Sequence, residues 1–170
     1  MEIVFQVHLI STGGTLEKIY HEQTGALHNT QSKLDRYLRQ LRLPQMAVEV
    51  HPLMNIDSLD MTDDHRRVIL ESVETQLPSA DAILITHGTD TMVTTGQFLK
   101  DKLTSVSKPI VMTGAMAPLG FEGSDGLQNV TESLIAARLL APGIFLVFHN
   151  QIFPIDRVRK DRELARFVPA

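Results

Sequence analysis

The sequence predicts an α/β fold in which a doubly wound, mostly parallel sheet of about five strands is covered by helices on both faces. Two observations lead to this prediction. Short apolar runs alternate with longer segments of helical period along the chain. The short runs are apolar on both faces, as is typical of strands buried inside a parallel sheet. The simplest arrangement of this length is flavodoxin-like, with strand order 2-1-3-4-5.

Each predicted strand has its own signal in the sequence. Residues 3–10 form a short apolar run rich in β-branched side chains, and residues 46–53 alternate apolar and polar positions. Residues 82–86 are almost continuously apolar. Residues 110–113 follow a proline, and residues 144–148 form the last apolar run. These five segments are the predicted sheet.

The predicted helices lie between these strands. Residues 32–41 place leucines on one face, and residues 62–77 begin at Thr62, a good N-cap residue, with two aspartates in the first turn. Residues 90–103 follow the third strand, and residues 125–140 end at a Pro-Gly pair. Residues 17–30 show no clear period, so this segment is either a lid over a site or a plain surface loop.

Length and composition narrow the class of protein. The 170 residues fit one domain, spanning 1–170, and the net charge of −4 argues against a nucleic-acid partner. The absence of cysteine excludes a thiol nucleophile, disulfides and thiolate metal sites. The seven histidines show no ligand spacing, so we expect no metal and no cofactor. With neither a secretory signal nor about 20 consecutive apolar residues, the expected location is cytoplasmic, without membrane contact.

Two glycine- and hydroxyl-rich loops follow the first and third predicted strands. They are residues 11–15 (Ser-Thr-Gly-Gly-Thr) and residues 87–91 (His-Gly-Thr-Asp-Thr). In a 2-1-3 order these strands are neighbours at the point where strand order reverses, which is where ligands bind in such folds. Each loop alone is equally well interpreted as a turn with a helix cap, but together they predict a site.

The ligand predicted for this site is an amino acid. The glycine spacing matches neither a dinucleotide fingerprint nor a Walker loop. An anionic ligand binds best at a helix N-terminus that carries no negative charge. Asp90 places a carboxylate at the start of the predicted helix of residues 90–103, so it disfavours an anion there. A zwitterionic ligand fits better, because the carboxylate can hold its ammonium while backbone N–H groups hold its carboxylate.

A threonine in these loops becomes a nucleophile only when another group takes its proton. Lys160 is one candidate, since it follows the last strand and can fold back along the carboxyl edge of the sheet. Its alternative interpretation is a lysine in a solvated tail. Tyr20 is a second candidate partner, five residues beyond Thr15, and its alternative is a loop aromatic packed on the domain.

Both loops closely resemble the two signature loops of bacterial-type L-asparaginases in sequence, order and separation. Residues 57–61 (Asp-Ser-Leu-Asp-Met) resemble the substrate-binding segment of that family. Residues 114–118 and 158–160 are similar to the segments that follow the fourth strand and that carry the catalytic lysine. The resemblance covers essentially the whole sequence.

The resemblance implies hydrolysis of L-asparagine to L-aspartate and ammonia through an acyl-threonine. Thr15, rather than Thr12, matches the primary nucleophile, and Thr89 matches a second catalytic threonine. The implied catalytic set is Thr15, Thr89, Asp90, Lys160 and Tyr20, and the implied substrate-binding set is Gly14, Asp57, Ser58, Gly88 and Ala115.

The sequence also departs from the family. Most members are about twice as long, and their C-terminal domain supplies an acidic residue to the site of a neighbouring protomer, so this sequence resembles a short, single-domain form. Glu17 either stands in for that acid or is a surface loop residue. Leu59 replaces a polar residue that often follows the serine. The resemblance further implies a homo-oligomer, a dimer or tetramer. Two alternatives stay open: a glutaminase or amidotransferase-related amidase, and a non-catalytic amino-acid-binding module.

Overall fold

A computed structural model describes residues 4–30 and 33–170, and its centre is a six-stranded sheet with order β4-β1-β5-β6-β7-β8. The first five strands are parallel, and β8 pairs antiparallel to β7. The predicted fold class and the order 2-1-3-4-5 are therefore confirmed, with one antiparallel strand added at the edge. The strands are β1 (Phe5–Gly13), β4 (Met46–Ile56), β5 (Ala82–Thr86), β6 (Pro109–Thr113), β7 (Gly143–Phe148) and β8 (Gln151–Pro154).

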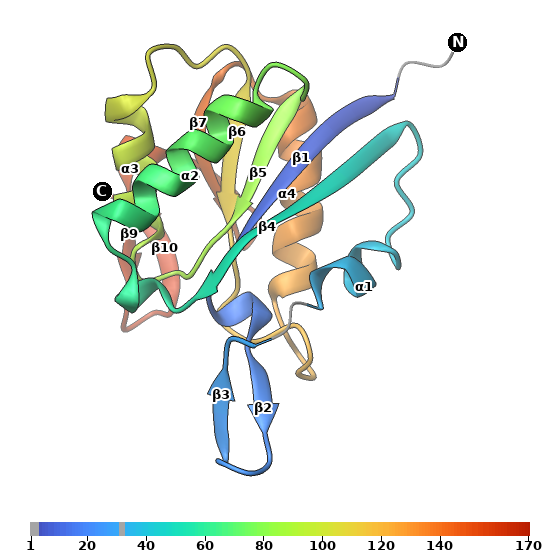
Figure 1. The fold of residues 1–170 in the computed structure, drawn as a ribbon, viewed down its shortest axis with the longest axis vertical. Coiled ribbons are helices and arrows are strands. Elements are labelled where there is room, and N and C mark those ends of the chain that lie inside the picture. Colours follow the sequence, from blue (N-terminus) through green and yellow to red (C-terminus); the bar gives the residue numbers. More distant parts are fainter. Residues whose placement is uncertain (1–3, 31–32) are drawn as a thin grey trace.

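Helices cover both faces of this sheet (Figure 1). Helices α2 and α3 pack on one face around Ile10 of β1, whereas α1 and α4 pack on the other around Val7 and Leu9. Side chains alternate between faces along a strand, which explains this division. The helices are α1 (Leu34–Leu38), α2 (Asp63–Gln76), α3 (Met92–Lys102) and α4 (Gly126–Leu139).

The helix and strand limits follow local chemistry. Thr62 caps α2 as predicted, in a capping box with His65. The predicted starting residues of the first strand and first helix, Ile3 and Ser32, lie outside the described residues. Within the described ranges, no helix combines the length and apolar character needed to cross a membrane.

Residues 17–30 form a β-hairpin, where the sequence indicated no regular structure. A short helix, η1 (Thr15–Glu17), leads into β2 (Ile19–His21), which pairs with β3 (Ala26–His28). The hairpin projects from the edge of the sheet at which β1 ends (Figure 1). Gly25, with φ 64°, closes its turn through a hydrogen bond from its N–H to the carbonyl of His21 at 2.8 Å.

The segment after β7 is folded, so its interpretation as a solvated tail is wrong. After β8 it continues through η3 (Ile155–Arg157) into a second hairpin, β9 (Val158–Asp161) and β10 (Arg166–Pro169). Val158 and Phe167 are buried in the core on the α2–α3 side. These two apolar residues anchor the hairpin, and one buried residue in each strand is too little to show a pattern in the sequence.

Candidate active site

Three loops meet backbone to backbone at the carboxyl ends of β1, β4 and β5. A Cβ atom added to Gly14 would lie 2.4 Å from the Cα of Gly88. A Cβ added to Gly88 would lie 2.4 Å from Ser58 Oγ. Gly14 also has φ 73°, a conformation that favours glycine. The predicted adjacency of the two glycine loops is confirmed, and the loop after β4 joins them.

A lysine, a threonine and a carboxylate come together beside these loops. The ammonium of Lys160 donates hydrogen bonds to Thr89 Oγ1 at 2.7 Å and to Asp90 Oδ1 at 3.0 Å. The Lys160 side chain is 17% exposed, since β9 holds it against the end of β5. Arg162, which the sequence analysis did not single out, also places a guanidinium nitrogen 3.0 Å from Asp90 Oδ1. The interpretation of Lys160 as a solvated lysine is therefore wrong.

The two threonines of the first loop have different surroundings. Thr12 is fully buried, and its hydroxyl donates to the carbonyl of Thr86 at 2.8 Å, which braces β1 against β5. Thr15 begins η1 and is only partly buried. Of this pair, Thr15 is thus the hydroxyl that a ligand at the loop can reach.

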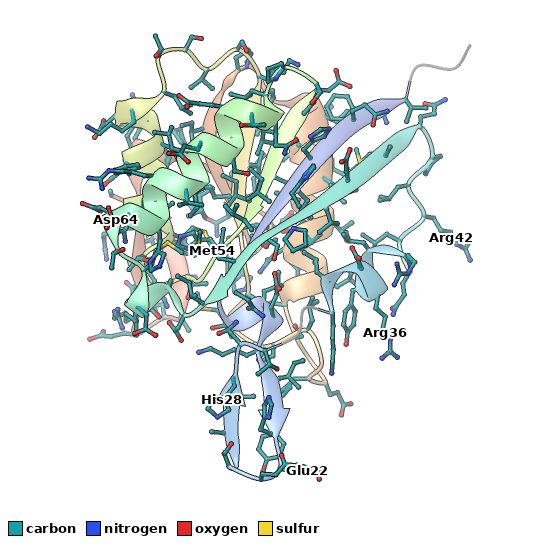
Figure 2. The ribbon with its side chains drawn as sticks, in the orientation of Figure 1. Glu22, His28, Arg36, Arg42, Met54 and Asp64 are labelled. Atoms are coloured by element: carbon teal, nitrogen blue, oxygen red, sulfur yellow. The ribbon has the colours of Figure 1, made fainter. Side chains whose placement is uncertain are left out.

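The hairpin beyond this loop carries Tyr20. Its side chain lies on β2 and is 54% exposed, so it does not pack on the domain as its alternative interpretation required. Figure 2 shows His28 on the same projecting hairpin and Glu22 at its tip. The Asn29 side-chain amide donates to the carbonyl of Gly14 at 2.8 Å and to Asn55 Oδ1 at 2.9 Å, which ties the base of the hairpin to the glycine loop.

The loop after β4 is held by a second ion pair. Lys18 places its ammonium 2.6 Å from Asp57 Oδ2, and this hydrogen bond is the main cause that lowers the pKa of Asp57 below its ordinary value, against the effect of burial. The other oxygen of Asp57 accepts from the Leu59 N–H at 3.0 Å. Ser58 is buried, and its carbonyl accepts from the Thr91 hydroxyl at 2.8 Å. Leu59 is exposed and makes this edge apolar.

A cavity of about 430 Å³ opens between this loop and the base of the hairpin. Its polar wall includes Lys18, Asn29, Asn55 and Asp57. This volume falls in the range of small-molecule sites, which is about 300–1,000 Å³. The cavity has room for a small polar ligand beside Asp57, but Thr15, Thr89, Asp90 and Lys160 do not line it.

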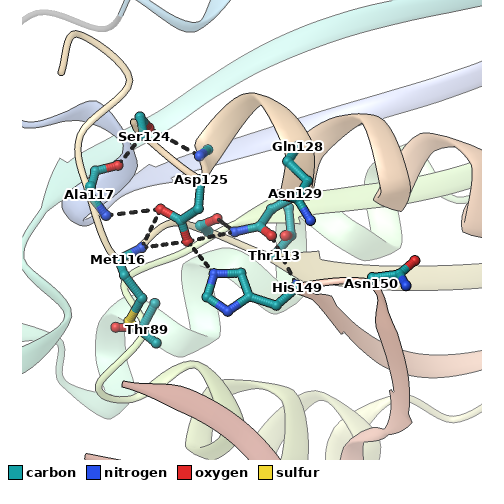
Figure 3. Close-up of polar contacts among 12 residues, drawn as sticks. Thr89, Thr113, Met116, Ala117, Ser124, Asp125, Gln128, Asn129, His149 and Asn150 are labelled. Atoms are coloured by element: carbon teal, nitrogen blue, oxygen red, sulfur yellow. Dashed lines mark hydrogen bonds and ion pairs between the residues drawn. The ribbon is translucent and has the colours of Figure 1, made fainter. Parts of the chain in front are cut away.

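Asp125 fixes the segment that contains Ala115 (Figure 3). Its carboxylate accepts from the N–H groups of Met116 and Ala117, each at 3.0 Å, and from His149 Nε2 at 2.7 Å. Burial would raise the pKa of Asp125, but these hydrogen bonds outweigh it and leave the pKa below its ordinary value. Ala115 itself is buried, with 1% of its surface exposed.

His87 supports the second glycine loop from beneath. Burial lowers its pKa from 6.5 to about 4, so the ring is neutral at neutral pH. Its Nδ1 donates to the carbonyl of Gly88 at 2.8 Å, and its Nε2 accepts from the Thr95 hydroxyl at 2.8 Å. His87 thus holds the Gly88 peptide in place from inside the domain.

Glu17 is buried and accepts a hydrogen bond from the Ser11 hydroxyl. Its interpretation as a surface loop residue is therefore wrong. The carboxylate lies under the first loop, where it links η1 to the end of β1.

Comparison with known proteins shows the family of the chain. Residues 6–166 match the family model of the asparaginase N-terminal domain. The chain belongs to the asparaginase family. It is 31% identical over 161 residues to "L-asparaginase 1" of Escherichia coli strain K12, a match that covers 91% of this chain and 47% of that protein.

The relatives of this asparaginase-family chain also include a protein that is named as part of an amidotransferase. The chain is 30% identical over 149 residues to a component of the glutamyl-tRNA(Gln) amidotransferase of Methanococcus vannielii, covering 86% of this chain and 34% of that protein. The structure of the thermostable L-asparaginase of Thermococcus kodakarensis matches with a TM-score of 0.88 at 28% identity, over 97% of this chain and 51% of that one. The chain thus spans about half the length of these asparaginases.

Proposed function

We infer that this asparaginase-family chain is an amidohydrolase that converts L-asparagine to L-aspartate and ammonia. The observation that carries this proposal is the contact of Lys160 with both Thr89 and Asp90, beside a loop whose one accessible threonine is Thr15. A hydroxyl nucleophile, an amine that can exchange its proton, and a carboxylate that orients the amine are the parts that acyl transfer through threonine requires.

In the proposed reaction, the Thr15 hydroxyl oxygen bonds to the side-chain carboxamide carbon of the substrate and gives up its proton. The carbon–nitrogen bond then breaks, and the nitrogen takes a proton and leaves as ammonia. Water attacks the acyl-threonine, which releases aspartate and restores the hydroxyl. Thr89 and Lys160 exchange protons through their 2.7 Å hydrogen bond. Tyr20 assists Thr15 when the hairpin lies over the site.

Backbone N–H groups around Gly88 and Thr89 are the proposed oxyanion donors. Such donors act on charge that develops only in the transition state, and removal of one usually costs about 2.7–4 kcal/mol. Neutral His87 supports this role, because its Nδ1–H holds the Gly88 carbonyl at 2.8 Å and so fixes the orientation of that peptide.

The amino-acid part of the substrate is proposed to bind between Asp90 and the loop that contains Asp57 and Ser58. The Asp90 carboxylate already receives the cations of Lys160 and Arg162. A substrate ammonium therefore joins or displaces the exposed Arg162 guanidinium. Gly14 and Gly88 are proposed to contribute backbone groups, since the neighbouring loop fills the space where a side chain would lie.

A related amidase is the second candidate, favoured by the similarity to part of an amidotransferase and by the apolar Leu59 beside Ser58. Ammonia release from L-asparagine and L-glutamine, measured side by side on the purified chain, distinguishes the two. We expect faster release from asparagine, and faster release from glutamine would contradict the substrate assignment. Aspartate binding in calorimetry with no ammonia from either amide would favour a non-catalytic module.

A Thr89→Val variant tests the mechanism within the same assay. The substitution keeps the shape of the side chain and removes the hydroxyl that Lys160 contacts. We expect loss of ammonia release with an unchanged circular dichroism spectrum. Thr75→Ala, at an exposed threonine of α2, is the matched control and should keep full activity. We further propose that the active form is a homo-oligomer, which sedimentation of the same samples tests.

A further inference from the structure

Two histidines and a glutamate lie together on the face of the sheet that α2 covers, apart from the candidate active site. In the parallel register of β1 and β4, His8 is paired with Glu49 and Ile10 is paired with His51. Because side chains two residues apart share a face, His8, Glu49 and His51 point to the same side. The sequence shows no ligand spacing among its histidines, since this cluster is assembled only by strand pairing.

The donor atoms of the three side chains are close enough for one metal ion. Nε2 of His8 lies 3.7 Å from Glu49 Oε2, and Nε2 of His51 lies 3.5 Å from Glu49 Oε1. One ligand atom from each of the three lies within 4.8 Å of the others. A tetrahedral ion with bonds of about 2.0–2.1 Å holds its donors roughly 3.3 Å apart. Rotations of side chains alone can therefore close the set around an ion.

Gln76 of α2 contacts both imidazole rings at Nδ1, while Nε2 of each ring lies toward Glu49. His8 Nδ1 lies 2.7 Å from Gln76 Oε1, and because an amide oxygen only accepts, Nδ1 carries the proton and Nε2 keeps its lone pair on the side of Glu49. Donation of the His8 ring N–H to an acceptor is the usual arrangement around histidines that bind metals. His51 differs, because its Nδ1 accepts from the Gln76 amide nitrogen at 3.4 Å, so metal binding through Nε2 requires that nitrogen to lose its proton.

A bound ion would explain why Nε2 of His51 is buried beside a carboxylate. Its Nε2 is buried and makes no hydrogen bond in residues 4–30 and 33–170, although the Glu49 carboxylate is near. A buried nitrogen is normally paired, and the Glu49 carboxylate oxygen 3.5 Å away is the acidic group that faces it.

The site is closed on one side and open on the other. The side chains of His8 and His51 are 9% and 23% exposed, whereas Glu49 is 64% exposed. Glu49 and His51 belong to β4, the edge strand of the sheet. An ion can therefore enter from solvent at Glu49, and water can occupy a fourth position.

We propose that His8, Glu49 and His51 bind one divalent transition-metal ion, with Zn²⁺ as its best representative. Two imidazoles and one carboxylate are a donor set that zinc accepts. The ion joins β1 to the edge strand β4, and it stabilises the native chain because an unfolded chain does not hold these donors together. This proposal is independent of the proposed hydrolysis. The alternative is a network of histidine and glutamate that holds no ion.

Calorimetric titration of the EDTA-treated chain with ZnCl₂ at neutral pH tests the proposal. We expect one ion per chain and a thermal midpoint that rises with Zn²⁺ concentration. Glu49→Gln keeps the shape of an exposed side chain, so it should fold normally and bind at least tenfold more weakly. Gln76→Met should weaken binding by about 10–100-fold, the usual effect of removing a group that orients a ligand.

A control addresses adventitious binding by other histidines. His21 and His28 form another close pair, with ring centroids 5.3 Å apart, on the projecting hairpin. His28→Ala should bind Zn²⁺ as the unsubstituted chain does. No uptake at millimolar Zn²⁺, unchanged affinity in Glu49→Gln, or loss of binding in His28→Ala would each overturn the proposal.

Discussion

The ammonium of Lys160 lies 2.7 Å from the hydroxyl of Thr89, a residue 71 positions earlier in the chain. The β9–β10 hairpin brings them together, anchored by Val158 and Phe167 in the core. The lysine thereby reaches the end of β5, where the second glycine loop begins. The proposed chemistry depends on this one contact between the C-terminal hairpin and the sheet.

Replacement of this lysine should therefore stop ammonia release. In Lys160→Met the aliphatic part of the side chain remains, but no amine contacts Thr89 or Asp90. A positioned acid–base group typically contributes about 10²–10⁴-fold, so we expect a loss of that size in kcat for asparagine. Lys102→Met, at an exposed lysine of α3, is the control. Activity in Lys160→Met equal to that of this control would exclude Lys160 from the reaction.

Gly88→Ala should damage both the site and the fold. The added Cβ would lie 2.4 Å from Ser58 Oγ and 2.5 Å from Ser58 Cβ, so the loops after β4 and β5 must separate. Overpacking of this kind costs about 1–3 kcal/mol of unfolding free energy. Urea unfolding and the ammonia assay measure the two effects.

Gly120→Ala is the matched control for this substitution, because a Cβ there meets nothing within 4 Å. It should leave the unfolding midpoint and the activity unchanged. If Gly88→Ala were as stable and as active as Gly120→Ala, the close approach of the loops would not matter to function.

The buried ring of His87 should make stability depend on pH. Its pKa is lowered from 6.5 to about 4 in the folded chain, so the unfolded chain binds the extra proton between these values. The contribution is fully present above pH 6.5 and is lost as pH falls toward 4. A shift of this size corresponds to about 3 kcal/mol.

Urea unfolding at several pH values measures this dependence. In His87→Gln the slope between pH 6.5 and 4 should become shallower, because the titrating ring is gone. An unchanged slope in His87→Gln would contradict the assignment.

Asp125→Asn should loosen the segment that follows β6. The amide has one acceptor oxygen where the carboxylate has two, so it cannot serve Met116, Ala117 and His149 together. A buried donor left without a partner costs about 1–3 kcal/mol. We expect a fall of that size in the free energy of unfolding at pH 7, with Asp101→Asn, exposed on α3, as control.

The sequence predicted the elements that bury continuous apolar surface. The bounds of β5 were predicted correctly, since all five of its residues are buried and therefore apolar or small. The hairpins β2–β3 and β9–β10 were not predicted, because strands of three or four residues are too short to show a period. Each strand of the second hairpin buries a single residue in the core, Val158 in β9 and Phe167 in β10, which is too little to show a pattern.

The candidate site also has contacts that the sequence predicted and contacts that it did not. Glycine loops are continuous in sequence, so the meeting of Gly14 with Gly88 followed from the predicted strand order. The ion pairs of Lys18 with Asp57 and of Arg162 with Asp90 were missed. Each joins residues far apart in the chain, and a charged residue carries no local signal of its partner.

Ammonia release by Thr15→Ala tests the central claim most directly. The purified variant is compared with the unsubstituted chain and with Thr75→Ala at the same asparagine concentration, after circular dichroism and urea unfolding show equal folding. We expect ammonia release to fall to background in Thr15→Ala alone. Full activity of a folded Thr15→Ala would contradict the claim that this threonine is the nucleophile.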